Sequence, residues 1–154
     1  MKYNKTVEHV DVEKFMGRWY VQAGRFTFLE KGAHNAVETY AYNKADEKIL
    51  IDFTFNKDSF DGKKKSIPQK GKIHNKQTGA HWKVSPFWPL EFDYLIIDLA
   101  DDYSWTAIGV PNQKYLWIMS RDWNFSDQKV QEVLNRLKDK GYDAENTVRV
   151  LHRW

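Results

Sequence analysis

The chain has 154 residues and an almost balanced charge, with 24 lysine and arginine residues against 21 aspartate and glutamate residues and a net charge of +3. A chain of this length can bury a substantial core, and we expect residues 1–154 to form a single domain. The balanced charge gives no indication of nucleic-acid binding. The absence of cysteine excludes disulfides, thiol nucleophiles and thiolate metal sites.

The sequence contains neither a signal-peptide pattern nor a membrane-spanning stretch. Its first residues, Met1 to Lys5, lack an apolar segment. The richest apolar run, Tyr94 to Leu99, is interrupted by Asp98 and is too short to cross a bilayer. We therefore expect either a soluble intracellular protein or a mature domain from which a signal peptide has been removed.

Short strand-like segments separated by turn signals follow one another along most of the chain. The alternation is clearest from Ile49 to Phe55, where every second residue is large and apolar. A short helical turn is expected at 12–16, and the polar stretch 56–69 is expected to be a long connection. Strands are expected at 17–25, 35–42, 49–55, 70–75, 81–85, 92–99, 105–110, 115–120 and 147–151.

The period changes from strand to helix only near the C-terminus. Ser126 is a suitable N-cap and Gly141 a suitable C-terminal stop. The apolar residues between them recur at helical spacing: Val130, Val133, Leu134 and Leu137. This order of elements predicts an all-β fold, an eight-stranded antiparallel up-and-down β-barrel with one C-terminal α-helix packed on the outside. Such a barrel is filled by side chains or holds one small ligand.

Three short stretches carry a resemblance to a known family. They are Gly17-Arg18-Trp19-Tyr20, Asp101-Asp102-Tyr103 and Ser120-Arg121, which in this order resemble the signature blocks of the lipocalins. The first stretch and Tyr115-Leu116-Trp117-Ile118-Met119-Ser120-Arg121 look most like the bacterial branch of that family, which includes the outer-membrane lipocalins. The resemblance implies the barrel fold, with signature residues Gly17, Trp19, Asp102, Tyr103 and Arg121.

Alternation in an up-and-down barrel assigns the connections to two rims. Those at 26–34, 56–69, 86–91 and 111–114 share one rim, and the resemblance implies that the opposite end is closed. At the closed end we expect the guanidinium of Arg121 to stack on Trp19. The alternative is a surface ion pair between Arg121 and Asp101 or Asp102.

The interior is expected to be lined mainly by aromatic and aliphatic side chains. The candidate ligand-binding residues are Glu38, Tyr40, Ile51, Phe53, Phe55, Trp82, Val84, Trp105, Tyr115 and Trp117. For any one of these rings, simple filling of the barrel is the alternative to ligand contact. Glu38 and Tyr115 are the candidate polar groups, and Glu38 faces solvent instead if its strand carries a bulge.

The open rim combines basic and apolar residues. Lys63, Lys64 and Lys65 are expected in its long connection, where they either form a solvated loop or attract anionic headgroups. Phe87 and Trp88 are expected either to be exposed at the rim or to fold inward as a lid.

The sequence shows no catalytic motif, and no cofactor or metal is expected. The resemblance favours a non-enzymatic protein that binds and carries a fatty acid, lysophospholipid or similar molecule, with a role in cell-envelope lipid maintenance. If a signal peptide and lipid anchor had been removed, the protein would lie on the periplasmic side of the outer membrane. Peripheral membrane contact and a homodimer are left open, and no nucleic-acid partner is expected.

Two alternatives to a lipid carrier remain. One is a lipocalin-fold enzyme for a lipid-like substrate, with Glu38 or Asp98 as acid/base. The other is a filled barrel that binds a protein.

Overall fold

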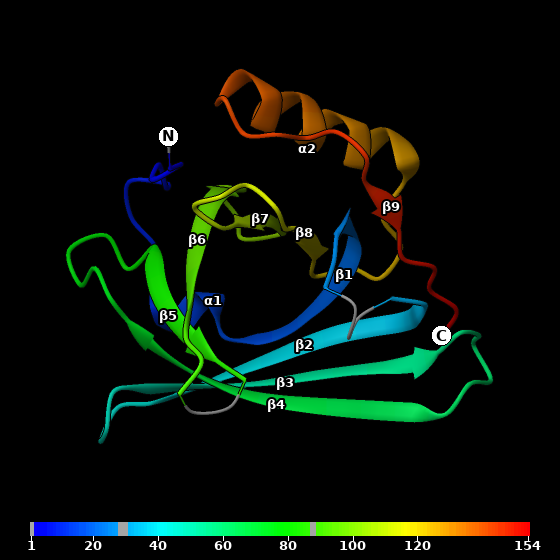
Figure 1. Cartoon of the computed structure of the whole chain (residues 1–154), viewed down its shortest axis with the longest axis horizontal. Coiled ribbons are helices and arrows are strands. Elements are labelled where there is room, and N and C mark those ends of the chain that lie inside the picture. The colour runs from blue at the N-terminus through cyan, green and yellow to red at the C-terminus, as the bar shows by residue number, and fades with distance from the viewer. Residues whose placement is uncertain (1, 28–30, 87–88) are drawn as a thin grey trace.

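The computed structural model describes residues 2–27, 31–86 and 89–154 (Figure 1). The helices in these ranges are α1 (Val12–Phe15) and α2 (Asp127–Asp139). The strands are β1 (Gly17–Arg25), β2 (Ala33–Asn43), β3 (Lys48–Lys57), β4 (Lys64–Ile73), β5 (His81–Ser85), β6 (Phe92–Leu99), β7 (Trp105–Gly109), β8 (Leu116–Ser120) and β9 (Val148–Arg149).

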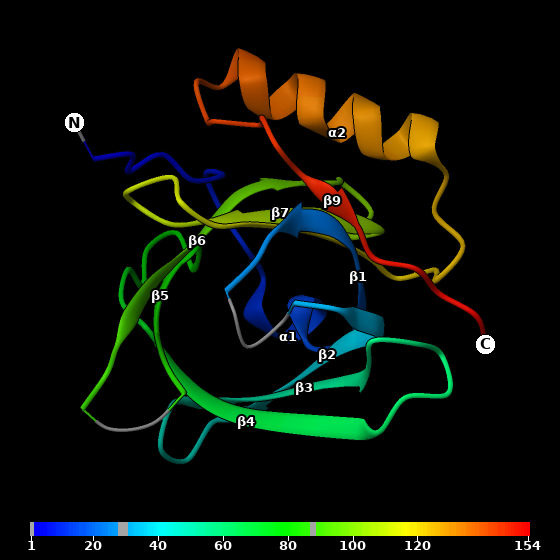
Figure 2. The ribbon, with the colours of Figure 1, turned by 45° about the vertical axis from the view of Figure 1, so that its right-hand side comes forward.

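The strands form a closed antiparallel barrel. Strands β2 to β8 pair in chain order, and β1 pairs with both β8 and β2, so that eight strands complete the ring. The ninth strand, β9, lies outside the ring and pairs with β1 at Ala23 and Gly24. Figure 2 looks into the barrel, with α1 at its far end. The expected barrel with one outer C-terminal helix is confirmed.

The C-terminal segment supports the barrel where β1 and β2 separate. These strands pair only through residues 17–20 of β1. Farther along, Val150 N donates to Gln22 O at 2.8 Å, and Asn35 N donates to Leu151 O at 2.9 Å. The segment therefore supplies backbone partners to both strand ends, which would otherwise be left open.

The expectation of a long connection at 56–69 is wrong. β3 continues to Lys57 and β4 begins at Lys64, so only residues 58–63 connect them. The stretch has a polar sequence because its outward face is exposed, whereas Ile67 and Gln69 face the interior. Pro68 is tolerated because this half of β4 pairs with β3 alone, and β5 pairs only with residues 70–73.

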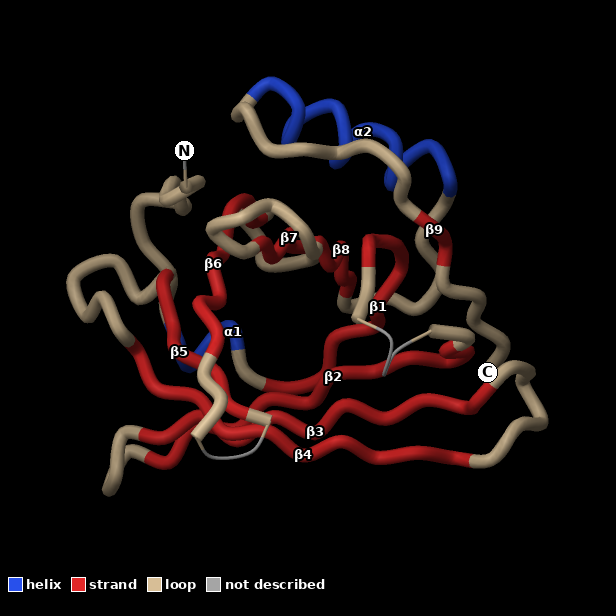
Figure 3. Tube along the Cα trace, viewed as in Figure 1, coloured by secondary structure: helices blue, strands red, loops and turns tan. Residues whose placement is uncertain are grey.

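The helix α2 covers the outer wall formed by β7 and β8 (Figure 3). Ser126 caps it by accepting a hydrogen bond from Lys129 N, and Val130, Val133 and Leu137 are buried. As expected, Leu116 and Ile118 face outward, into a second hydrophobic core that lies between α2 and the outer wall of the barrel. No helix in the described ranges is long and apolar enough to cross a membrane.

An ion pair between the buried Asp98 and the exposed Arg136 fixes α2 to the barrel. A bulge in β6 between Ile96 and Asp98 turns the Asp98 side chain to the outer wall. There its carboxylate accepts hydrogen bonds from Arg136 Nε at 2.8 Å and Nη2 at 3.0 Å. The alternative in which Asp98 acts as an acid/base inside the barrel is therefore wrong.

The closed end is plugged by α1 and the signature residues. Phe15 is fully buried, 5.0 Å from the Trp19 ring and 5.3 Å from the Trp82 ring. Arg121 lies with its guanidinium carbon 3.8 Å from the centre of the Trp19 ring, so the expected stack is observed. Gly17 has φ +97°, a conformation that favours glycine, and a Cβ there would lie 3.4 Å from Arg121 Nη1.

Candidate ligand-binding site

A cavity of about 420 Å³ occupies the barrel between this plug and the open end. Its volume is within the range of small-molecule sites. Most of its wall is aliphatic or aromatic, and the polar groups are few. The lining residues are Thr27, Glu38, Tyr40, Ile51, Ile67, Gln69, Val84, Pro86, Leu90, Phe92, Asp93, Tyr94, Ile108, Val110, Tyr115 and Trp117. The barrel is therefore not filled by its own side chains, which removes the main premise of the protein-binding alternative.

Most of the residues expected in the interior do lie there. Six line the cavity: Glu38, Tyr40, Ile51, Val84, Tyr115 and Trp117. Phe53, Phe55 and Trp82 belong to the buried interior core without lining the cavity. Trp82 is covered by Tyr94, whose ring stacks on it at 4.7 Å with an interplanar angle of 4°.

The expectation for Trp105 is wrong. Trp105 packs in the outer core beneath α2, with Arg136 Cζ 5.3 Å from its ring centre. The pairing register explains this. Trp117 points into the cavity, and Ile108, which lies opposite it on β7, therefore points inward as well. Trp105 is three residues from Ile108 and therefore has the opposite orientation.

Two acidic residues border the cavity, but only Glu38 turns its carboxyl group into it. Asp93 lies opposite Lys83 in the pairing of β5 and β6, on the outer face, where its carboxylate binds Lys83 at 2.5 Å and His81 at 2.8 Å. Burial favours its neutral form, but these partners hold the pKa of Asp93 below its ordinary value. Glu38 is buried, 7 % exposed, and accepts a hydrogen bond from the hydroxyl of Tyr40. The inward orientation of Glu38, which the sequence left open, is thus settled.

Glu38 belongs to a chain of three buried oxygens. The hydroxyls of Tyr40 and Tyr94 are 2.7 Å apart. When Glu38 is ionised, Tyr40 donates to Glu38, and Tyr94 then donates to Tyr40. Burial raises the pKa of Glu38 to about 7, although the Tyr40 hydrogen bond opposes the shift. Burial and the nearby carboxylate also raise the pKa values of both tyrosines, so both stay protonated.

Several cavity residues were missed by the sequence argument. Tyr94 and Ile108 lie in segments that are apolar on both faces, so alternation could not assign their orientation. Ile67 and Gln69 fall in the stretch interpreted as a loop. The signal available was weak: Ile67, which pairs with Phe53 of β3, is the single large apolar residue in the range 61–69.

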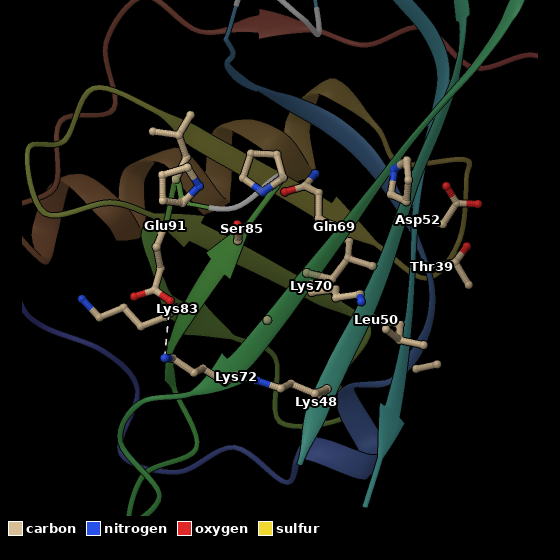
Figure 4. A pocket seen from close by; sticks show the side chains of 17 residues that line it. Thr39, Lys48, Leu50, Asp52, Gln69, Lys70, Lys72, Lys83, Ser85 and Glu91 are labelled. Atoms are coloured by element: carbon tan, nitrogen blue, oxygen red, sulfur yellow. Dashed lines mark ion pairs between the residues drawn. The ribbon is translucent and has the colours of Figure 1, made fainter. Parts of the chain in front are cut away.

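The role of the three rim lysines remains a prediction. Lys63 lies in the connection, but Lys64 and Lys65 belong to β4, and none of the three lines the cavity. Other lysines of this sheet instead border a hollow on the outer face of β2 to β5 (Figure 4), where Lys72 pairs with Glu91 at 3.5 Å. Phe87 and Trp88 are outside the described residues.

Comparison with known proteins identifies the family. Residues 10–152 match the model of the Lipocalin-like domain. The chain belongs to the lipocalins. It is 29% identical over 143 residues to the Outer membrane lipoprotein Blc of Escherichia coli K12, covering 92% of this chain and 79% of that protein. It is 27% identical over 151 residues to Temperature-induced lipocalin-1 of Arabidopsis thaliana, with the same coverage of 92% and 79%.

The lipocalin fold is also found among solved structures. Insecticyanin from the tobacco hornworm Manduca sexta has a TM-score of 0.71 at 18% identity, covering 96% of this chain and 84% of that one. The match supports the fold alone. The resemblance to the bacterial branch, first suggested by Gly17-Arg18-Trp19-Tyr20, is confirmed by the similarity to the bacterial lipoproteins.

The remaining signature residues of this lipocalin have structural contacts. Tyr103 adopts φ 60°, and its hydroxyl accepts a hydrogen bond from Asp11 N at 2.8 Å, next to α1. Asp102 accepts from Ser104 N at 3.0 Å, which stabilises the turn before β7. Both residues therefore shape the closed end and do not reach the cavity.

Proposed function

We propose that this lipocalin binds and carries one small hydrophobic or amphiphilic molecule inside its barrel. The observation that supports this most directly is the cavity of about 420 Å³ with apolar walls. Aliphatic side chains from four strands, among them Ile51, Ile67, Val84 and Ile108, border it. Each methylene transferred from water to such a wall contributes about 0.8 kcal/mol, which gives a single alkyl chain a considerable driving force.

The proposed ligand class is a single-chain lipid such as a fatty acid or a lysophospholipid. Leu90 and Phe92, which are 45% and 49% exposed, line the cavity near its opening and offer an apolar approach to it. Because relatives at 23% to 29% identity are named outer membrane lipoproteins, we also propose a role in lipid maintenance of the cell envelope. Peripheral contact with a membrane and a homodimer remain predictions.

We propose binding without turnover. Glu38 is the one acid/base candidate of the sequence that lines the cavity, and its contacts are the hydroxyl of Tyr40 and an apolar wall. If the protein were an enzyme, a bound lipid would change chemically during incubation. Mass spectrometry of the ligand recovered after incubation separates these alternatives.

Titration with fatty acids and lysophospholipids of increasing chain length tests the proposal. Isothermal calorimetry should show saturable binding near one ligand per chain, with an increase in affinity of up to about fourfold per methylene until the cavity is full. Ile67→Trp, which places a large ring in the cavity, should weaken binding. Leu50→Trp, on the exposed outer face of β3, is the matched control and should leave the affinity unchanged. Absence of saturable binding for all single-chain compounds would overturn the proposal.

A further inference from the structure

The inner end of the cavity is polar, in contrast to its walls. Glu38 and the hydroxyls of Tyr40 and Tyr94 meet there, next to the buried rings that plug the barrel. An alkyl chain that entered with its methyl end first would meet these oxygens and give them no hydrogen bond. Removing water from a carboxyl group without replacing its hydrogen bonds is unfavourable.

One oxygen of Glu38 is available for a ligand. The Tyr40 hydroxyl occupies Oε2, whereas Oε1 has no hydrogen-bond partner among the described residues. Every fully enclosed side-chain nitrogen or oxygen in the described ranges has a partner. The unpartnered Oε1 is therefore accessible, and since Glu38 lines the cavity, the cavity is the space that reaches it.

The charge around the cavity has one sign. The carboxyl group of Glu38 faces it, and the described residues that line it include no lysine, arginine or histidine. The other titratable side chains that face it are Tyr40, Tyr94 and Tyr115, because the Asp93 carboxylate points to the outer face and pairs there with Lys83 and His81. An ionised carboxylate or phosphate at the inner end would lie beside Glu38 without a cation to balance it.

We propose that the cavity selects single-chain amphiphiles whose inner end is a hydrogen-bond donor, a hydroxyl or an ammonium group, held by the free oxygen of Glu38. This inference rests on the proposed function, because it requires an apolar chain in the cavity. It reverses the orientation that headgroup binding at the rim lysines would give: the head lies at the closed end and the chain points to the opening. It also narrows the proposed ligand class, because a fatty acid should bind more weakly than an amine or alcohol of the same chain length. An ammonium head binds the ionised form of Glu38, and a hydroxyl binds either form.

A matched series with one chain length tests the proposal. Dodecylamine, dodecanol and dodecanoic acid are titrated below their micelle concentrations, one pH unit above and one below the Glu38 pKa of about 7. At the higher pH, dodecylamine should bind at least about tenfold more tightly than dodecanoate, with dodecanol between them. Lowering the pH should weaken dodecylamine binding and leave dodecanol almost unchanged. The net charge of +3 opposes cation binding, so a preference for the amine cannot come from the overall field.

Substitution identifies the group responsible. Glu38→Gln should reduce dodecylamine affinity about tenfold or more at the higher pH and have a smaller effect on dodecanol. Glu132→Gln removes the same charge from the exposed face of α2 and should change neither affinity. If Glu38→Gln failed to fold, the pH series on the unaltered protein would still decide the question.

The results that would overturn the inner-end selection differ from those that would overturn the lipid-binding proposal. Equal or tighter binding of dodecanoate, or an unchanged dodecylamine affinity in folded Glu38→Gln, would overturn the inner-end selection and leave the lipid-binding proposal intact. If none of the three compounds bound, the inner-end selection would be wrong, and if the fatty acids and lysophospholipids of the chain-length series also failed to bind, the lipid-binding proposal would be wrong as well.

Discussion

The guanidinium carbon of Arg121 lies 3.8 Å from the centre of the Trp19 ring, so that a cation covers the tryptophan at the closed end of the barrel. The same guanidinium donates to the carbonyl oxygens of Lys14, Phe15 and Met16 at 2.8, 3.1 and 2.9 Å. These carbonyls belong to the end of α1 and have no further turn of helix to bind them. Arg121, which directly follows β8, therefore contacts Trp19 with the face of its guanidinium and binds the end of α1 with the N–H groups at its edge.

Arg121→Ala is expected to lower the free energy of unfolding by about 1–3 kcal/mol, because the ring loses its cover and the carbonyls of Lys14 and Met16 lose their donor, while Phe15 O keeps its bond from Trp19 Nε1. Urea denaturation measures the change. Arg121→Lys keeps the charge but lacks the planar fork, so it should recover only part of the loss. An Arg121→Ala midpoint equal to that of the unaltered protein would contradict this account of the plug.

The hydrophobic core between α2 and the barrel wall gives a second prediction. Leu137 is fully buried, whereas Leu134 is only half-buried at the edge of the same cluster. Leu137→Ala should therefore cost about 2–5 kcal/mol, and Leu134→Ala distinctly less. The exposed Gln131→Ala is the control and should be nearly neutral. Equal losses for the two leucines, measured by chemical denaturation, would mean that the helix is rotated relative to the wall.

Local patterns predicted those parts of the fold in which one face is apolar and the other polar. The alternation of Ile49, Ile51 and Phe53 specified β3, and Ser126 and Gly141 bounded α2 to within a residue or two. The alternation in β2 likewise predicted that Tyr40 faces the cavity, whereas the direction of Glu38 stayed open until the structure placed it.

The errors occurred where orientation depends on pairing between strands. The direction of Trp105 follows from the register of β7 against β8, which no residue in its own segment reveals. Asp98 faces outward because of a bulge. Tyr94 was missed because β6 is apolar on both faces, one covered by α2 and the other facing the interior.

The ion pair between Asp98 and Arg136 gives a third prediction. The Asp98 side chain is 3% exposed and that of Arg136 is 54% exposed, so removal of the arginine leaves a nearly buried carboxylate with Lys140 at 3.9 Å as its remaining cation. Arg136→Ala should cost about 1–3 kcal/mol, the range for a buried polar group that loses its partner. Asp98→Asn combined with Arg136→Met should cost less than the sum of the single changes, because neither charge is then left alone. Additive losses in this double-mutant cycle would show that the pair does not hold α2.

Glu38 makes the stability of the protein depend on pH in an unusual direction for a carboxyl group. Its pKa is raised from 4.5 to about 7 in the folded chain by burial. Between these values the folded protein binds the proton that the unfolded chain has released, so stability falls as the pH rises. The contribution is complete below pH 4.5 and is lost as the pH rises through about 7. Most surface carboxyl groups, which pair with cations, have the opposite effect.

Glu38→Gln should remove this pH dependence. The free energy of unfolding of the unaltered protein, relative to the variant, should fall by about 3 kcal/mol between pH 4.5 and pH 8. Taking the difference between the two proteins cancels the titration of groups they share, such as His152, whose pKa burial lowers. Tyr40→Phe removes the hydrogen bond that opposes the shift, so it should raise the pKa of Glu38 further and extend the slope to higher pH. The measurement is urea denaturation at several pH values. Parallel stability curves for the unaltered protein and the Glu38→Gln variant would mean that the carboxyl group is solvated, and the polar inner end of the cavity would then need another explanation.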